Sequence, residues 1–397
     1  MDSCDVLIVG GGPAGSSCAW GLKGTPLDTV ILDKCTFPRD KVCGGWVTPA
    51  ALDELEVDPE EYAAGRVFQP IMGFLTSSMG GREVQTSYGK PISFGIRRCE
   101  FDEFLLNRSG ARVFQGMPLT TLERSADHWV VNGQMKARMV VGAGGHFCPV
   151  ARFLRTGAHK ERAIAAQEIE FEMSSSQRGN CSIRGEVPEL YFCPDMKGYG
   201  WCFRKQNFLN VGIGRLDPHA LPNHFSAFIQ FLRKTRRIAF DLPTSIAGHA
   251  YLLHSETRRK LIDDNILLIG DAAGLAYSQS GEGIRPAIES GLLAAKTILA
   301  ADGNYNRESL ESYRTLLATR FGKSENDWAI AVGRRLPTPL VRAFARVLLA
   351  NPWLSRHVIL DRWFLHRTEP ALNFRGRERS DEAIGRLVKK ATVEAQD

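Results

Sequence analysis

The chain has 397 residues, which is enough for two to three domains at roughly 150 residues each. Hydrophobic residues make up 44% and charged residues 24%, and these values exclude a disordered or fibrous chain. The net charge of +6 is concentrated in one place, because residues 331–370 carry seven arginines against two acidic residues. This distribution predicts a local basic surface and argues against a nucleic-acid-binding protein.

The first predicted elements form a βαβ unit. Residues 5–10 are a continuous apolar run typical of a buried strand, residues 13–22 predict a helix of small residues, and residues 28–33 predict a second strand. Two strands that are joined by a helix over about 30 residues are expected to pair in parallel.

The pattern changes further along the chain. Residues 92–98 predict a strand and residues 100–107 a short helix. Between about 160 and 255, segments with period-two alternation predict an antiparallel sheet with one covered face. Residues 266–269 return to the buried-strand type, and residues 283–301 predict a long amphipathic helix.

Cysteine usage and hydropathy exclude further classes of protein. Nine cysteines occur without a Cys-x-x-Cys pair and without an N-terminal secretion signal. We therefore expect no disulfide framework, no metal site and a reduced, cytoplasmic location. No run of about 18 apolar residues is present, so no membrane-spanning helix is expected.

A Gly10-x-Gly12-x-x-Gly15 motif follows the first predicted strand and opens the helix. Gly10 permits a tight turn, Gly12 lets the backbone approach a pyrophosphate, and Gly15 lets helix and strand pack closely. Asp33 ends the next strand, where a carboxylate accepts hydrogen bonds from ribose hydroxyls. The alternative is a glycine-rich turn with a solvated Asp33. The predicted contacts of a dinucleotide are Gly10, Gly12, Pro13, Ala14, Gly15, Asp33 and Lys34.

A second glycine motif follows the strand predicted at residues 266–269. It reads Gly-Asp-Ala-Ala at residues 270–273 and Gly-Glu-Gly-Ile at residues 281–284. The pattern resembles the second flavin motif of the flavoprotein family that contains aromatic hydroxylases and geranylgeranyl reductases. The resemblance implies FAD, with Asp271 on the ribityl chain or a ribose and the helix start facing the pyrimidine edge of the flavin, whose reduced form is anionic. The residues that it assigns are Gly270, Asp271, Gly281, Gly283 and Ile284.

Two more segments resemble the reductase branch of that family. Lys41-x-Cys43-Gly44-Gly45 is similar to a segment that lies against the flavin ring, where the two glycines allow close approach of the backbone. Cys43 is either a redox or proton-donating thiol or a small buried residue. Arg98 opens a segment similar to the helix start whose arginine contacts the flavin chain or phosphate, and the alternative is a surface cap. The assigned roles are cofactor binding for Lys41, Gly44 and Arg98 and catalysis for Cys43 and Gly45.

A third similarity to the reductase branch is the strand Tyr199-x-Trp201-x-Phe203, although Arg204 stands where the branch has proline. The three aromatic side chains share one face of a strand. Tyr199 and Trp201 are therefore catalytic-site candidates as the roof of a substrate pocket, with plain sheet packing as the alternative. Gly144 replaces the aspartate of the family's Gly-Ala-Asp-Gly segment, which argues against an NAD(P)H-driven hydroxylase.

The resemblance implies an α/β fold with a Rossmann-like FAD-binding domain, an inserted antiparallel-sheet substrate domain and a helical C-terminal region. The expected boundaries are residues 1–70, 92–160 and 256–302 for the FAD-binding domain, 71–91 and 161–255 for the substrate domain, and 303–397 for the C-terminal region.

Three functions stay open. The first is reduction of C=C bonds in an isoprenoid or lipid-like substrate by hydride from reduced flavin N5; the Lys-x-Cys-Gly-Gly segment and Gly274, where hydroxylases usually carry histidine, favour it. The second is a flavin-dependent monooxygenase or halogenase that acts on an aromatic or polyketide-type molecule. The third is a non-catalytic flavin electron-transfer module.

The expected partners are a hydrophobic small-molecule substrate and an electron donor, either NAD(P)H or another reduced carrier. Within residues 331–370, Trp353, Trp363 and Phe364 stand among arginines. This composition fits either a peripheral membrane contact or a solvated helical face.

Overall fold

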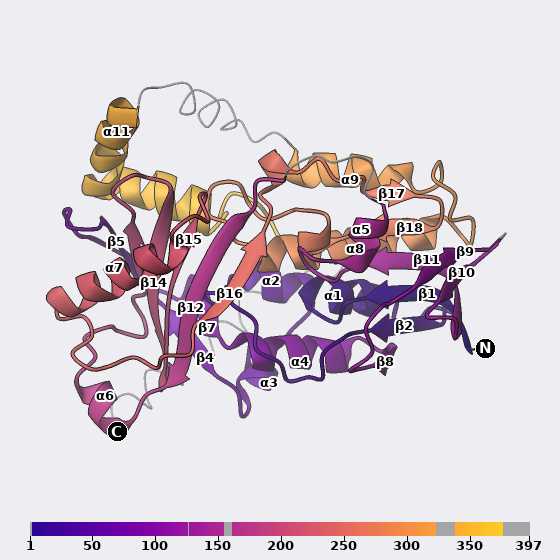
Figure 1. Cartoon of the computed structure of the whole chain (residues 1–397), viewed down its shortest axis with the longest axis horizontal. Helices are drawn as coiled ribbons and strands as arrows, with labels where there is room; N and C mark the ends of the chain where they lie inside the picture. Colours follow the sequence, from indigo (N-terminus) through magenta and orange to yellow (C-terminus); the bar gives the residue numbers. More distant parts are fainter. Residues whose placement is uncertain (1, 126, 155–160, 323–337, 376–397) are drawn as a thin grey trace.

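The computed structural model describes residues 2–125, 127–154, 161–322 and 338–375, which form three sheets with helices packed around them (Figure 1). Sheet A has the strand order β17-β18-β11-β1-β2-β8, with β10 and β9 added beside β11. Its strands are β1 (Asp2–Val9), β2 (Thr29–Leu32), β8 (Arg112–Phe114), β9 (Leu122–Arg124), β10 (Trp129–Val131), β11 (Met135–Gly142), β17 (Ile262–Asp263) and β18 (Ile266–Leu268).

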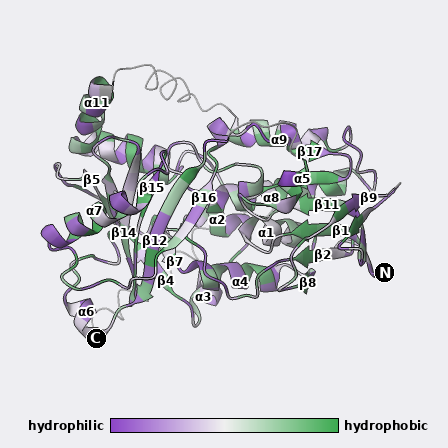
Figure 2. Cartoon of the chain, in the orientation of Figure 1, coloured by the Kyte–Doolittle hydropathy of each residue, from purple (hydrophilic) through white to green (hydrophobic). Residues whose placement is uncertain are grey.

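Parallel pairing joins distant parts of the sequence in sheet A. β1 pairs in parallel with β2, as the βαβ prediction required, and on its other side with β11. β18 then pairs in parallel with β11, so residues 266–268 lie two strands from the N-terminal strand. Figure 2 shows β1, β2 and β11 coloured as hydrophobic, as expected for strands of a parallel sheet that is covered on both faces.

Helices α1 (Pro13–Leu22) and α8 (Ile284–Ala300) pack side by side against this sheet. Small residues make the approach close, since a Cβ added at Gly291 would lie 2.4 Å from the carbonyl oxygen of Ala14. The other helical elements are α2 (Pro49–Glu54), α3 (Pro59–Ala63), α4 (Arg98–Arg108), α5 (Pro149–Phe153), α6 (Ser175–Gly179), α7 (Leu221–Lys234), η1 (His254–Glu256), η2 (Gly270–Ala272), α9 (Glu311–Phe321), α11 (Thr338–Ala350), α12 (Pro352–Leu354) and η3 (Ser355–Phe364).

Sheet C is the predicted antiparallel sheet, apart from one parallel pair between β13 and β5. Its order is β16-β12-β15-β14-β13-β5-β6. The strands are β5 (Gly73–Ser78), β6 (Val84–Ser87), β12 (Ile164–Glu172), β13 (Glu189–Phe192), β14 (Gly198–Lys205), β15 (Phe208–Arg215) and β16 (Ala247–Tyr251); a small sheet B joins β3 (Trp46–Val47), β7 (Ser93–Ile96) and β4 (Phe68–Ile71).

The expectation of one covered face in sheet C was wrong. On one face α7 buries Phe225 and Phe228 against strand residues such as Cys202 and Val211. The opposite face packs against α11 and η3, because the aromatic side chains of β14 point there. β5 and β6 bring residues 73–87 into this sheet, and the division of the chain into domains stays a prediction.

The predicted helical C-terminal region is described in part. Residues 323–337 and 376–397 of this region lie outside the described residues. Trp353 is 64% exposed and Trp363 is partly exposed, whereas Phe364 is buried, so the expectation of a surface position was wrong for Phe364. Within the described ranges, no helix combines the length and the apolar character that a bilayer-spanning segment needs.

Candidate functional site

A cavity of about 510 Å³ lies where the N-terminal turn, the loop before β3, β14, β16 and the start of α8 meet. Its size is in the usual range of ligand sites. The predicted residues that line it are Gly10, Gly12, Pro13, Ala14, Asp33, Lys34, Lys41, Cys43, Gly44, Gly45, Arg98, Tyr199, Trp201, Asp271, Gly281, Gly283 and Ile284. Gly15 and Gly270 do not line it; they allow the segments behind it to pack.

The turn before α1 has the geometry that the glycine motif predicts. Gly10 has φ of +117°, and a Cβ there would lie 2.4 Å from the carbonyl oxygen of Ala143. A Cβ at Gly15 would lie 1.9 Å from the carbonyl oxygen of Gly10. Gly12 is different, because a Cβ there would meet only the end of the Arg39 side chain, at 3.3 Å. Gly12 therefore leaves room for a ligand, whereas Gly10 and Gly15 are required by the backbone.

Two helices begin at the cavity with glycine at the N-cap position. Gly12 is the N-cap of α1 and Gly283 is the N-cap of α8; in the first turn of α8 the N–H of Arg285 already donates to the side chain of Glu282 at 2.8 Å. The first backbone N–H groups of a helix and its dipole attract anions. The start of α1 therefore offers the freer position for negative charge, because one N–H group at the start of α8 is paired with Glu282.

Asp33 is held at the end of β2 by the main chain. Its Oδ2 accepts from the N–H of Gly11 at 2.6 Å and its Oδ1 accepts from the N–H of Cys35 at 2.8 Å. Each carboxylate oxygen has a second lone-pair site. Asp33 is thus oriented by the turn and still able to accept a hydrogen bond from a ligand hydroxyl.

Arg98 faces the cavity from the start of α4. It donates from Nε and Nη2 to the two carboxylate oxygens of Asp102, at 2.8 and 2.9 Å. Arg39 also lies 3.2 Å from Asp102, so two guanidinium groups share one buried carboxylate. The two arginines and Asp102 together leave a net positive charge at the cavity wall. Arg98 is buried, which disagrees with a surface cap role.

Asp271 belongs to a small polar cluster on the other wall. His249 Nε2 lies 3.5 Å from Asp271 Oδ2, and Lys41 Nζ lies 2.8 Å from the same histidine nitrogen. Burial would raise the pKa of Asp271, but the hydrogen bond from His249 and the charge of Lys41 lower it to about 2. Burial lowers the pKa of Lys41 to about 8, against the opposing effect of Asp271. Asp271 is therefore an ionised hydrogen-bond acceptor at the cavity.

Two buried side chains of sheet C hold the loop that carries Cys43. Glu168 accepts from the N–H of Cys43 at 2.9 Å, and Asn210 donates to the carbonyl oxygen of Cys43 at 3.2 Å. Gly45 has φ of +67°, and a Cβ there would clash with Lys205 and with the backbone of β7. The main chain at Cys43 is therefore held at both its N–H and its carbonyl oxygen. The half-buried Cys43 lines the cavity, and its Sγ accepts from the N–H of Gly45 at 3.4 Å.

The aromatic side chains on one face of β14 have two different surroundings. Tyr199 and Trp201 line the cavity, and both polar groups have partners: Tyr199 donates to the carbonyl oxygen of Ser280 at 2.6 Å and Trp201 to Asn210 at 2.7 Å. Phe203 instead packs on Trp46 with a ring-centroid distance of 5.0 Å. Plain packing thus explains Phe203, while Tyr199 also ties the sheet to the loop that precedes α8.

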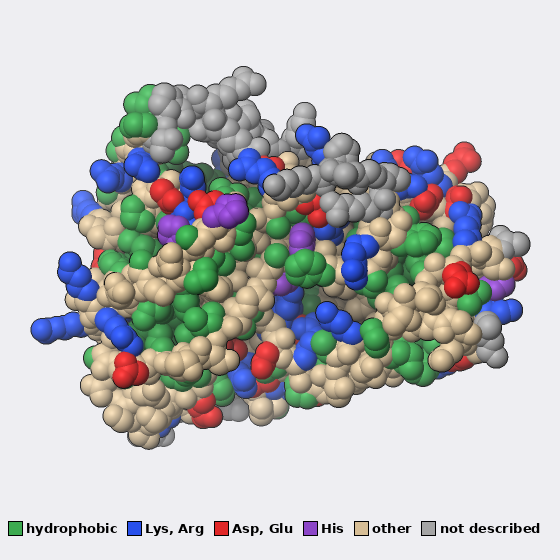
Figure 3. Space-filling view, in the orientation of Figure 1, with side chains coloured by type: hydrophobic (Ala, Val, Ile, Leu, Met, Phe, Trp, Pro, Cys, Tyr) green, Lys and Arg blue, Asp and Glu red, His purple; other side chains and the backbone are tan. Residues whose placement is uncertain are grey.

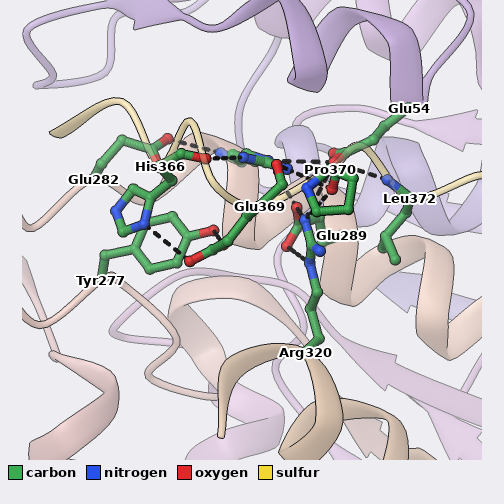
Figure 4. Close-up of polar contacts among 10 residues, drawn as sticks. Glu54, Tyr277, Glu282, Glu289, Arg320, His366, Glu369, Pro370 and Leu372 are labelled. Carbon is green, nitrogen blue, oxygen red and sulfur yellow. Dashed lines mark hydrogen bonds and ion pairs between the residues drawn. The ribbon is translucent and has the colours of Figure 1, made fainter. Parts of the chain in front are cut away.

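A buried ionic cluster supports the start of α8 from behind (Figure 4). Arg285 of α8 lies 2.8 Å from Glu289 and 3.3 Å from Glu54, and it donates to the carbonyl oxygen of Glu369 at 3.0 Å. Burial and the neighbouring Glu289 raise the pKa of Glu54 well above its ordinary value. The N–H of Arg285 donates to Glu282 at 2.8 Å, so the same residue fixes the cavity loop and the chain beyond η3.

Sequence reasoning missed the side chains that position the loop and the second wall. Glu168 and Asn210 lie on adjacent strands of sheet C, and His249 lies on its edge strand. None of them belongs to a glycine motif. The one signal was the amide of Asn210 in the mostly apolar β15, because a buried amide needs partners; Glu168 does not stand out, since β12 also carries Gln167, Glu170 and Glu172.

The carboxyl group of Glu168 gives a pH-dependent prediction. Burial raises the pKa of Glu168 from 4.5 to about 8, so its neutral form is favoured in the folded state. A raised carboxyl pKa means that stability falls as pH rises from about 5 to about 8, since the folded state then holds the extra proton. Glu168→Gln should remove about 3 kcal/mol of this pH dependence from the free energy of unfolding, measured by urea denaturation at a series of pH values.

Glu172→Gln is the matched control, because Glu172 lies on the same strand and is exposed. Its unfolding curves should follow those of the unmodified chain at every pH. Parallel pH profiles for Glu168→Gln and the unmodified chain would contradict the assignment.

Known proteins resemble the chain over most of its length, although no protein-family model matches it. It is 29% identical over 370 residues to a menaquinone reductase of Mycobacterium tuberculosis, which covers 87% of this chain and 86% of the relative. It is 26% identical over 338 residues to digeranylgeranylglycerophospholipid reductase 3 of Methanosphaera stadtmanae, covering 80% and 83% of the two chains.

Solved structures share the fold. A geranylgeranyl bacteriochlorophyll reductase-like protein from Thermoplasma acidophilum matches with a TM-score of 0.74 and 20% identity over 93% of this chain and 98% of that chain. A variant of the halogenase PltM in complex with FAD matches with a TM-score of 0.64 and 18% identity over 94% and 87%. These comparisons confirm the fold class and the resemblance that the glycine motifs indicated. The chain is therefore similar in sequence to proteins named as reductases, and it shares the fold of a geranylgeranyl bacteriochlorophyll reductase-like protein and of a halogenase that binds FAD.

Proposed function

We propose that the chain is an FAD-dependent reductase of C=C bonds in an isoprenoid or lipid-like substrate. The observation that carries the proposal is the convergence of three segments on one cavity. The α1 turn, the clamped Cys43 loop and the start of α8 all line it, and the aromatic side chains of β14 form a wall beside them. The relatives named as reductases support the same reaction class.

The residues at the cavity fit FAD. The open space at Gly12 and the uncapped start of α1 suit a diphosphate, and Asp33 suits a ribose. Asp271 is an ionised acceptor for the hydroxyls of the ribityl chain, and Arg98 adds positive charge nearby. The start of α8 at Gly283 stabilises negative charge on the flavin. When bound and reduced, FAD supplies a hydride to one carbon of a double bond.

The chain itself has to supply a proton for the neighbouring carbon. It also has to provide a binding site that fits the substrate and excludes water. We assign the proton to Sγ of Cys43, because Cys43 lines the cavity and its main chain is fixed by Glu168 and Asn210; its Sγ accepts from the N–H of Gly45, which leaves the S–H proton available. The hydroxyl of Tyr199 is already committed to Ser280, which makes it a weaker candidate. Trp46 and Trp201 form an apolar wall that suits a hydrocarbon chain and excludes water.

The test is an anaerobic product assay. The protein is loaded with FAD, reduced with dithionite and mixed without oxygen with a geranylgeranyl lipid or a polyprenyl quinone, and the products are analysed by mass spectrometry. We expect products with two additional hydrogens for each double bond that is reduced, and none with reduced FAD alone. No saturated product, together with oxygen incorporation into an aromatic acceptor in air, would establish the monooxygenase instead.

A further inference from the structure

The described C-terminal helices expose an unusual concentration of apolar side chains. Nine large hydrophobic side chains are exposed among the described residues, and four of them lie within 14 positions of each other. They are Leu340 at 56%, Phe344 at 65%, Val347 at 58% and Trp353 at 64%. The first three follow the i, i+4, i+7 spacing and therefore form one stripe along α11. In Figure 3, hydrophobic side chains lie on the surface where α11 projects from the molecule.

The charge on the same segment is of one sign. Arg342 and Arg346 are exposed one helical turn apart, and residues 338–360 contain no aspartate or glutamate. The next acidic residue, Asp361, accepts a hydrogen bond from Arg367 at 3.0 Å. The exposed side of α11 thus combines an apolar stripe with arginines that have no carboxylate within their own segment.

The inner side of α11 belongs to the apolar core next to the cavity. Ala345, Leu348 and Leu349 are buried, and the two leucines belong to the cluster that contains Trp46 and Trp201. Both tryptophans also line the cavity. The helix therefore forms one layer between the outside of the molecule and the apolar wall of the site.

We propose that α11 and Trp353 dock on the headgroup region of a bilayer that contains anionic lipid. Apolar side chains that enter the boundary of the acyl chains, with arginines at the level of the phosphates, are the features of an interfacial helix. A second copy of the chain fits this surface less well, because a twofold contact would place the same arginine-bearing face against itself. The docking goes beyond the proposed reaction and does not depend on it.

Vesicle co-sedimentation of the full FAD-loaded chain tests the proposal. The chain should bind vesicles of phosphatidylcholine with phosphatidylglycerol more strongly than vesicles of phosphatidylcholine alone, and salt should weaken the difference. Phe344→Ser/Val347→Ser should lower binding to both vesicles by about tenfold or more. Arg342→Gln/Arg346→Gln should lower only the binding to anionic vesicles, by about fivefold for each arginine.

Two control variants remove similar groups elsewhere. Ile246→Ser/Leu299→Ser removes exposed apolar side chains, and Arg82→Gln/Arg307→Gln removes the same charge; both should bind vesicles like the unmodified chain. The FAD content of every variant should be unchanged, which separates this test from that of the reaction. An unmodified chain that stays in the supernatant with both vesicles, or a Phe344→Ser/Val347→Ser variant that still binds fully, would overturn the proposal. A dimer in analytical ultracentrifugation that the same double substitution dissociates would also overturn it.

Discussion

Gly12→Val should lower the affinity for FAD by about 100-fold, which corresponds to the loss of about two hydrogen bonds from backbone N–H groups to a charged phosphate. The backbone at Gly12 has φ of −72° and ψ of −175°, a conformation that valine adopts without strain. The valine side chain would nevertheless occupy the space in front of α1 that a diphosphate needs. The measurement is a fluorescence titration of the apoprotein with FAD.

A glycine in open space is the control for this change. Gly179 is exposed at the end of α6, and no heavy atom lies within 4 Å of a Cβ added there. Gly179→Val should bind FAD normally. The two variants should also unfold at the same temperature without FAD. Full FAD binding by Gly12→Val would show that the diphosphate does not approach this turn.

Cys43→Ser should slow the reduction of the substrate by about 100-fold to 10,000-fold, the usual contribution of a general acid. A serine hydroxyl is a much weaker acid than a thiol. The position of the loop should be preserved, because Glu168 and Asn210 hold the main chain of residue 43 and not its side chain. The measurement is the single-turnover rate at which a prenyl substrate reoxidises the reduced enzyme without oxygen, compared with the FAD content.

Cys181→Ser supplies the matched control, because Cys181 is also a half-buried free thiol but lies outside the cavity. It should react at the rate of the unmodified enzyme. If Cys43→Ser does so as well, Cys43 is a packing residue and the proton comes from another group.

Local patterns were sufficient to predict the elements that carry the cofactor motifs. Continuous apolar runs placed β1, β2 and β18, and the glycine spacing predicted the turn before α1, because each depends on residues close in sequence. The resemblance of the motif at residues 270–284 then linked β18 and α8 to the same cavity, which local rules alone do not provide. The roles of the individual residues toward FAD stay predictions.

What the sequence did not reveal depends on register between distant strands. Glu168 and Asn210 meet because β12 and β15 pair with a particular register, and a slip of one strand by one residue would turn its side chain to the other face, away from its partner. The burial of Phe364 likewise depends on where η3 packs on sheet C. Composition suggested an exposed position for Phe364. That expectation was wrong because composition carries no information about which residues another element covers.

A crystal structure of the chain with FAD tests the central claim most directly, namely that glycine-rich segments distant in the sequence hold one flavin nucleotide. The account predicts the diphosphate at the start of α1 beside Gly12 and the flavin ring between Gly44 and Gly283. Density for FAD at any other place in the molecule, or an isoalloxazine ring remote from the Cys43 loop, would contradict it.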